Sequence, residues 1–282
     1  MTLKLGLIGY PLGHSASPWI HENFMKKIAE TGTYEKFTIE PGPDFGERIA
    51  TLKSANLDGF NVTVPHKETI IPYLDELSED AKNMGAVNTV AQVNGKWIGY
   101  NTDGSGYVRS LENAYPELTT DKEQKIIILG AGGAARGIYY ALMKAGYHTI
   151  DLANRTVSTA KEIATLNDGK VHTRIKTLEE AEATIGEYDV IIQTTSVGME
   201  PNVQASIISL KHLKEKTIVS DIVYKPLDTK FLTEAKTYNG RIHYGHAMLL
   251  YQALYAFEIW SGKEVPIENM DEALKAYVQR SN

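Results

Sequence analysis

The sequence predicts an α/β protein of two domains, an N-terminal α/β domain with a mostly parallel sheet and a C-terminal Rossmann-like doubly wound domain. Short apolar strands alternate with amphipathic helices in two separate series, and this alternation is typical of parallel sheets. A glycine-rich turn follows the first strand of the second series directly. The 282 residues, 43% of them hydrophobic, are enough for two domains with full cores.

The first series begins with an apolar strand at Leu3–Ile8, which ends at Gly9. Ser17 and Pro18 then provide an N-cap and a first helical position for a helix to about residue 31. The pair Asn94-Gly95 between two apolar runs predicts a β-hairpin. The same patterns predict further strands at 37–39, 59–64, 87–93 and 96–100, and helices at 45–55, 67–84 and 104–115.

The second series begins at Ile126, and right-handed crossovers between its strands give a doubly wound sheet. Strands are expected at 126–129, 149–153, 171–175, 189–194 and 218–222, with helices at 134–144, 158–166 and 178–185. We expect two last helices, at 249–260 and 271–279, to pack back toward the first domain. The first domain is therefore 1–103 plus about 250–282, and the second is about 104–249.

Composition excludes several classes of function. The absence of cysteine excludes disulfide frameworks, thiolate metal sites and cysteine nucleophiles, and it fits a reducing compartment. A net charge of −6 lacks the basic field that nucleic-acid binding needs. No window of eighteen apolar residues is present, and the N-terminus is strand-like rather than a secretory signal. We expect a cytoplasmic protein without membrane or nucleic-acid partners, as a monomer or homodimer.

The glycine-rich turn matches the dinucleotide fingerprint G-x-G-x-x-A. It follows an apolar strand and opens a helix, so glycines permit a tight turn while the helix N-terminus offers N–H groups to a pyrophosphate. A merely tight strand-to-helix turn is the structural alternative, but this context favours dinucleotide binding. The expected phosphate-binding residues are Gly130, Ala131, Gly132, Gly133 and Ala134.

The end of the next strand should distinguish the two nicotinamide cofactors, and it reads Asn154-Arg155-Thr156. No carboxylate at this tip can bind a ribose 2′-hydroxyl, whereas Arg155 can bind a 2′-phosphate and Thr156 can add a hydroxyl donor. NADP is therefore the expected cofactor. Two alternatives stay open: Arg155 as a solvated loop residue, and Asp151 as a ribose-binding acid, although Asp151 is expected in mid-strand.

Four polar motifs of the first half fall where strands end or turns begin, and ligands of open α/β sheets collect there. They are 14–18, 61–67, 85–89 and 101–104. Each has a structural alternative: Ser17 and Asp103 can cap helices, Asn88 can form a turn, and Asn61 with Thr63 can make a solvent-exposed strand face. Lys67 is harder to explain structurally, because a cation in the first turn of its expected helix opposes the macrodipole.

Taken together, these motifs resemble those of the shikimate dehydrogenases over nearly the whole chain. The resemblance also covers 130–134, 154–156, 195–199, 221–226 and 245–252, all in the expected order. It implies reversible reduction of 3-dehydroshikimate to shikimate with NADPH. It implies the substrate ligands Ser15, Ser17, Asn61, Thr63, Lys67, Asn88, Asp103, Tyr224 and Gln252, and it adds Glu79, Asn154, Thr195, Ile222 and Gly245 to the cofactor ligands.

By the same resemblance Lys67 and Asp103 are the catalytic pair, which holds and relays the proton of the reacting oxygen. Lys67 can either exchange that proton or stay cationic and stabilise the oxyanion. Two departures from the family stand out: Thr159 where a second basic residue is frequent, and His246 followed by Ala247. No carboxylate cluster accompanies the histidines, so no metal is expected. A quinate or dual-specificity dehydrogenase, and a non-catalytic NADP-binding sensor, are the alternative functions.

Overall fold

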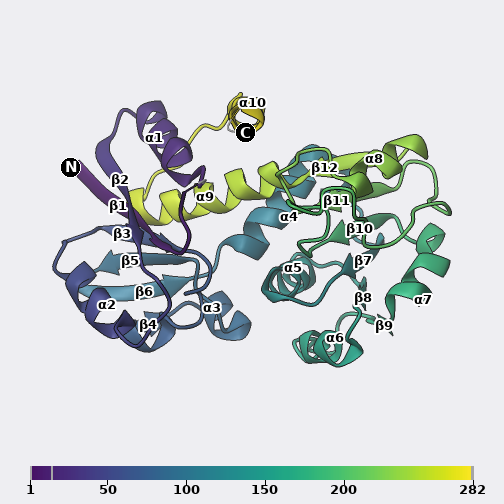
Figure 1. The fold of residues 1–282 in the computed structure, drawn as a ribbon, viewed down its shortest axis with the longest axis horizontal. Coiled ribbons are helices and arrows are strands. Elements are labelled where there is room, and N and C mark those ends of the chain that lie inside the picture. Colours follow the sequence, from purple (N-terminus) through teal and green to yellow (C-terminus); the bar gives the residue numbers. More distant parts are fainter. Residues whose placement is uncertain (1, 14, 281–282) are drawn as a thin grey trace. The chain divides into compact units, whose positions relative to one another are not determined.

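The computed structural model describes residues 2–13 and 15–280, which form two compact units, each with its own sheet (Figure 1). The chain up to Thr102 forms the first unit together with Gln252–Met270. Asp103–Tyr251 forms the second unit together with the chain from Asp271 on. The two-domain α/β class predicted from the sequence is confirmed.

The first unit has a six-stranded sheet in the order β2-β1-β3-β5-β6-β4. Its strands are β1 (Thr2–Gly9), β2 (Thr31–Thr38), β3 (Gly59–Val62), β4 (Glu76–Leu77), β5 (Thr89–Val93) and β6 (Lys96–Tyr100). Strand β1 pairs in parallel with β2 and β3, whereas β5 runs antiparallel to β3 and β6. Its main helices are α1 (Ser17–Lys27), α2 (Phe45–Lys53) and α3 (Glu79–Met84). Phe45 and Ile49 of α2 pack with Phe60 of β3 in one buried core.

The helix expected at 67–84 is wrong, because this stretch folds as turns, a 3-10 helix (Ile71–Tyr73), β4 and α3. Pro72 lies inside it, and proline in a helix interior lacks the N–H and clashes with the preceding turn. Ser78 then caps α3, since its side chain accepts from Ala81 N. Lys67 therefore does not lie in a helix, and the macrodipole argument does not apply to it.

The second unit has a sheet of order β12-β11-β10-β7-β8-β9, and every pairing in it is parallel. Its strands are β7 (Lys125–Leu129), β8 (Thr149–Ala153), β9 (Ile175–Lys176), β10 (Val190–Gln193), β11 (Ile218–Asp221) and β12 (Arg241–Tyr244). Its helices include α4 (Asp103–Ala114), α5 (Gly133–Lys144), α6 (Val157–Ala164), α7 (Leu178–Ala183) and α8 (Lys230–Thr237), with 3-10 turns at Pro116–Thr119 and Ile185–Glu187.

Strand β7 shows why the second sheet is covered on both faces. Ile126 and Ile128 belong to one buried cluster, whereas Ile127 and Leu129 belong to another. Successive side chains of a strand point to opposite faces, so a continuous apolar run predicts a sheet buried on both sides. The doubly wound order reverses next to β7, where dinucleotide sites of this fold class lie.

The C-terminal helices divide between the units. Helix α9 (Gly245–Ser261) begins in the second unit and ends in the first, and α10 (Met270–Arg280) continues in the second unit. This differs from the hypothesis that all of 250–282 joins the first domain. His246 Nε2 in the first turn of α9 lies 3.2 Å from Asp271 Oδ1 of α10, a contact within the second unit. Over the described residues, no helix is long and apolar enough to cross a membrane.

Candidate functional site

The polar motifs of the first unit meet at one edge of its sheet. Strands β1 and β3 are parallel and end there, at Gly9 and Val62. Strand β5 runs the opposite way, so its first residue, Thr89, lies at this edge opposite Asn61 and also opposite Tyr100, the last residue of β6. The residues that follow or precede these strand ends are therefore neighbours in space, as the sequence hypothesis requires.

Ser15 and Ser17 lie at the start of α1, and their hydroxyls are hydrogen-bonded at 3.2 Å. Ser17 is buried, and the N-cap position belongs to Ala16, with no side-chain cap. The structural alternative that Ser17 caps α1 is therefore wrong, and its hydroxyl stays part of the polar edge. His14, in the same motif, lies outside the described residues.

Thr63 reaches this edge because Gly9 leaves room for it. A Cβ at Gly9 would stand 2.3 Å from Thr63 Cγ2, and Thr63 N donates to Ile8 O at 2.9 Å. Lys67 is half-buried in the turn that follows, and its carbonyl accepts from Val87 N at 2.8 Å. That bond fastens the lysine backbone to the segment preceding Asn88.

Asn88 and Gln252 are brought together from distant parts of the first unit. Asn88 is buried, and its Nδ2 donates to Gln252 Oε1 at 3.3 Å. Thr102 N donates to Asn88 Oδ1 at 2.9 Å, and the Thr102 hydroxyl donates to the Gln252 carbonyl at 2.9 Å. These bonds place an amide donor and an amide acceptor side by side, an arrangement suited to a hydroxyl group.

Asn61 is also at this edge but is only 6% exposed. Its side-chain amide hydrogen-bonds to Tyr34, His21, Thr89 and the Asn88 carbonyl. The alternative that this strand face is simply solvated is therefore wrong for Asn61.

Two of the expected substrate ligands belong to the second unit. Asp103 is the first residue of α4, and Gly104 after it packs so closely on α5 that a Cβ there would stand 2.2 Å from Gly137 O. Tyr224 follows β11, and burial raises the pKa of its hydroxyl. Both side chains are half-buried.

The glycine-rich turn has the geometry of a phosphate cradle. Gly130 follows β7 with φ +113°, and a Cβ there would stand 2.6 Å from Thr194 Oγ1, so only glycine fits. Gly132 is the N-cap of α5 without a side-chain cap, and Cβ atoms at Gly132 or Gly133 would meet nothing within 4 Å. The N–H groups of the first turn of α5 are thus open to an anionic group. Ala131 and Ala134 complete this turn.

The loop after β8 keeps Arg155 exposed. Asn154 Nδ2 donates to Thr156 O at 2.9 Å and to Thr159 Oγ1 at 2.8 Å, and the Thr159 hydroxyl donates to Thr156 O at 2.7 Å. Thr159, the departure from the family pattern, therefore fixes the loop rather than adding a cation. Arg155 is exposed and forms no ion pair with any described residue.

Asp151 is not at this tip. It is fully buried inside β8, and it accepts from Arg174 N at 2.8 Å, Arg174 Nε at 2.9 Å and the Tyr188 hydroxyl at 2.7 Å. The alternative that Asp151 reads a cofactor ribose is contradicted by this placement. Glu79, expected as a further cofactor ligand, is an exposed residue of the first unit, at the start of α3.

Thr195, Ile222 and Gly245 follow β10, β11 and β12 in the second sheet. Ile222 N donates to Gln193 O at 3.1 Å, and a Cβ at Gly245 would stand 2.4 Å from Ile222 O. Gly245 therefore allows the start of α9 to touch the end of β11. Each of the three residues thus lies at the carboxyl end of a parallel strand.

Two buried polar residues behind this edge were missed as site residues by sequence reasoning. Gln193 Nε2 donates to Asp221 Oδ1 at 3.0 Å and to Val197 O at 3.1 Å, and Gln193 Oε1 accepts from Thr195 N. Asp221 also accepts from Val223 N and Thr229 Oγ1, and burial raises its pKa to about 6. The sequence carried a signal for them, since each is a polar residue at the last position of a strand.

His243 and His66 have partners within the protein. His243 accepts or donates at both ring nitrogens, to Ser220 Oγ at 2.8 Å and to Ser110 Oγ at 3.1 Å. Burial lowers the pKa of His243 to about 4, which keeps it neutral. His66 Nε2 lies 2.6 Å from Ile39 O. No group of three potential metal-ligating side chains occurs among residues 2–13 and 15–280.

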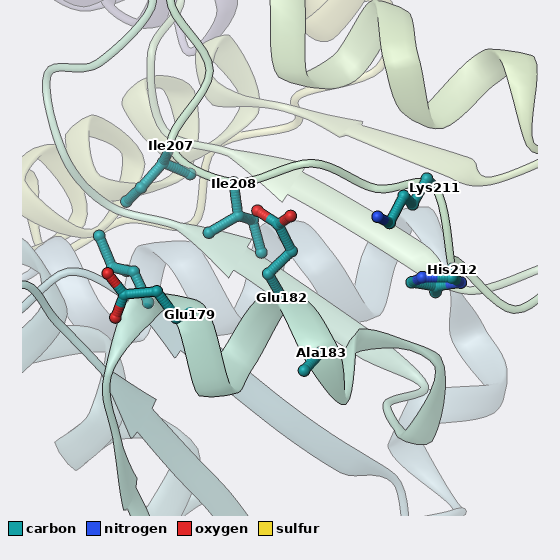
Figure 2. A pocket seen from close by; sticks show the side chains of 8 residues that line it. Glu179, Glu182, Ala183, Ile207, Ile208, Lys211 and His212 are labelled. Carbon is teal, nitrogen blue, oxygen red and sulfur yellow. The ribbon is translucent and has the colours of Figure 1, made fainter.

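A separate pocket of about 540 Å³ lies in the second unit, between α7 and the 207–212 segment (Figure 2). Leu178, Ile207 and Ile208 supply apolar walls, and Glu182 Oε2 accepts from Ser209 N at 2.9 Å, which ties the segment to α7. Its other lining residues are Glu179, Ala183, Lys211 and His212. None of the site residues expected from the sequence lines it.

Comparisons with known proteins identify relatives of this chain over nearly its whole length. Models of the shikimate dehydrogenase substrate-binding domain, of shikimate / quinate 5-dehydrogenase and of the shikimate 5′-dehydrogenase C-terminal domain match residues 7–90, 112–227 and 245–275. The chain is 53% identical to the shikimate dehydrogenase (NADP(+)) of Oceanobacillus iheyensis, over 96% of each chain. A crystal structure of a shikimate dehydrogenase in complex with NADP+ superposes with a TM-score of 0.88 at 38% identity, covering 98% of this chain and 96% of that one. The enzyme of Thermus thermophilus in complex with NADP(H) and shikimate gives 0.84 at 30% identity, over the full length of both.

Proposed function

The chain belongs to the shikimate dehydrogenase family, and from this premise we propose how its residues carry out the family's reaction. It is an NADP-dependent oxidoreductase of aromatic amino acid biosynthesis that reduces 3-dehydroshikimate reversibly to shikimate, at a CH–OH group. The observation that carries the residue assignment is the gathering of serine, threonine, lysine and amide side chains at one edge of the first sheet.

We propose that the substrate carboxylate is bound by the hydroxyls of Ser15, Ser17 and Tyr224. The two serine hydroxyls lie 3.2 Å apart, so both can donate to one carboxylate, in line with the strength of hydrogen bonds to charged acceptors. We propose that the remaining polar groups of the first domain's motifs, with Asp103, bind the ring hydroxyls of the substrate. These are Thr63, Lys67, Asn88, Asp103 and Gln252.

Two turns of the second unit support NADP binding: the one before α5 and the one after β8. The uncapped start of α5 offers backbone N–H groups to the pyrophosphate, and exposed Arg155 offers a guanidinium to the 2′-phosphate. The loop bonds of Asn154 and Thr159 hold Arg155 in place at the end of β8. We assign the nicotinamide end to Thr195, Ile222 and Gly245, with Glu79 as a further cofactor ligand.

When bound, NADPH supplies the hydride that reduces the carbonyl carbon. The chain must orient the carbonyl and stabilise the negative charge that develops on its oxygen. We assign this role to Lys67, whose ammonium transfers a proton to that oxygen as the hydride reaches the carbon, and to Asp103, which accepts a hydrogen bond from the resulting hydroxyl. In the reverse direction the same pair removes the hydroxyl proton of shikimate.

Steady-state kinetics of the purified protein test this assignment. We expect fast oxidation of NADPH with 3-dehydroshikimate, and at least tenfold lower kcat/KM with NADH, because Arg155 binds only the phosphorylated cofactor through its guanidinium. Parallel assays with 3-dehydroquinate measure the acceptance of the related acid. Turnover mainly with dehydroquinate or NADH would overturn the specificity and assign the chain to the quinate branch of the family.

We also propose a monomer or homodimer of the cytoplasm, without nucleic-acid or membrane partners. The net charge of −6 and the absence of cysteine support this proposal. Light scattering on the eluate of a size-exclusion column measures the assembly, and a larger particle would contradict it.

A further inference from the structure

We propose that Asn61 and Thr89 are positioning residues, which hold the amide of Asn88 in the orientation that binds a substrate hydroxyl. Asn61 is then not itself a substrate ligand. This inference rests on the proposed function, in which Asn88 and Gln252 bind the substrate. It follows from a buried hydrogen-bond network that lies entirely within the first unit.

The hydrogen-bonding capacity of the Asn61 side chain is fully used by the protein. Its Oδ1 accepts from the Tyr34 hydroxyl at 2.7 Å and from His21 Nε2 at 3.1 Å. Its Nδ2 donates to Asn88 O at 3.2 Å and to Thr89 Oγ1 at 3.1 Å. A side-chain amide has two lone pairs on oxygen and two N–H groups, so all four positions are occupied.

The orientation of the Asn61 amide is set by its neighbours. The Asn88 carbonyl can only accept, so the nitrogen of Asn61 must face it and the oxygen must face Tyr34 and His21. His21 therefore carries its proton on Nε2. It is fully buried, and burial lowers its pKa to about 3, so the ring is neutral.

Thr89 in turn determines the orientation of the Asn88 side-chain amide. The Thr89 hydroxyl accepts from Asn61, so its single proton goes to Asn88 Oδ1 at 3.0 Å. Thr102 N donates to the same oxygen at 2.9 Å. With Oδ1 held by two donors, the Nδ2 of Asn88 faces two acceptors, Thr102 Oγ1 at 2.9 Å and Gln252 Oε1 at 3.3 Å. The bond to Gln252 is the longest of the four, and it is the one that a substrate hydroxyl can replace by accepting from Asn88 and donating to Gln252.

The network also reaches the serine pair. Tyr34 is buried, which raises the pKa of its hydroxyl, and the nearby Ser17 side chain opposes that rise. Ser17 is one of the residues proposed to bind the substrate carboxylate. Tyr34 thus lies between the network around Asn61 and the proposed carboxylate-binding serines.

The test compares Thr89→Val with Thr89→Ser in shikimate oxidation, followed by the appearance of NADPH. Valine keeps the volume but removes the hydroxyl, so we expect the KM for shikimate to rise about tenfold while the KM for NADP stays within twofold. Serine keeps the hydroxyl and should restore the shikimate KM to within about twofold of wild type. Thr217→Val is the matched control, because it removes a buried threonine bond to Tyr188 O, 3.1 Å long, in the second unit.

Two results would overturn the proposal. Equal shikimate KM values for Thr89→Val and wild type would show that the hydroxyl does not position Asn88, as would an equal rise of KM in Thr217→Val. If Thr89→Val does not fold, Tyr34→Phe removes one donor to Asn61 and must raise the shikimate KM selectively.

Asn88→Ala separates this failure from failure of the proposed function. If it raises the shikimate KM strongly while Thr89→Val has no effect, only the positioning role is refuted. If Asn88→Ala leaves the KM unchanged as well, the proposed substrate site is refuted together with it.

Discussion

Asp151 and Arg155 lie on one segment, but the structure gives them opposite roles. Asp151 is buried in β8 and Arg155 is exposed in the loop after it. We expect Asp151→Asn to lower stability and leave cofactor preference unchanged, and Arg155→Ala to do the reverse. The pair tests directly which residue distinguishes NADP from NAD.

The cost of Asp151→Asn can be worked out bond by bond. The Asp151 Oδ2 atom accepts from the buried Tyr188 hydroxyl at 2.7 Å, and from Arg174 Nε at 2.9 Å and Nη2 at 2.8 Å. A hydrogen bond to a charged acceptor contributes about 1.5–3 kcal/mol, and both residues of the Tyr188 bond are fully buried. The side chain of Arg174 is 44% exposed, so its two bonds contribute less than about 1 kcal/mol each. The loss is therefore about 3–4 kcal/mol, or roughly 10 °C in melting temperature.

For Arg155→Ala the expected change lies in specificity alone. Loss of one charge-assisted contact to the 2′-phosphate, at about 1.5–3 kcal/mol, lowers the ratio of kcat/KM for NADPH over NADH roughly tenfold to a hundredfold. Because Arg155 is exposed, its melting temperature should stay within about 1 °C of wild type. Circular dichroism melts and the two kcat/KM values for each variant are the measurements. A tenfold change of the ratio in Asp151→Asn, or none in Arg155→Ala, would refute the reasoning.

Three further predictions concern the catalytic pair, a buried acid and a helix contact. Lys67→Ala should lower kcat by two or more decades while shikimate still binds, and near-normal turnover would refute the role of Lys67. Burial raises the pKa of Asp221 from 3.8 to about 6, so the folded protein binds this proton more tightly than the unfolded chain does. The resulting stabilisation is complete below pH 4, and the free energy of unfolding falls by about 3 kcal/mol as the pH rises through 6. Urea unfolding should show this loss in wild type but not in Asp221→Asn, and equal pH profiles would contradict it. Gly104→Ala places a Cβ 2.2 Å from Gly137 O, and overpacking of this kind lowers the free energy of unfolding by about 1–3 kcal/mol. An unchanged melting temperature would mean that α4 and α5 separate freely.

Local sequence patterns were sufficient for most elements. The apolar run of β7 followed by Gly130 predicts both the buried parallel strand and the turn that needs a positive φ, because each depends only on neighbouring residues. Local rules failed where proline overrode a helical pattern, as at Pro72. Helix α8 and strand β12 carry short, weakly periodic patterns and were not predicted.

In the candidate site, too, some features were predictable from local sequence and others were not. The residue types and their order were sufficient to name Ser17, Lys67, Asn88 and Arg155, since the chemistry of each motif is local. Their partners were not predictable. The hydrogen bond between Asn88 and Gln252 joins residues 164 positions apart, and only folding brings such groups together.

The sequence by itself therefore determined the fold class, the dinucleotide turn and the family, because these depend on short-range periodicity, glycine positions and motif order. The tertiary structure alone decided which polar residues are satisfied within the protein. Asp151 and Asn61 are both polar residues within otherwise apolar strands, yet burial and specific partners make one an ion-pair anchor and the other the centre of a network. Burial makes an unpaired polar group costly, so each of these side chains takes the role that its long-range neighbours allow.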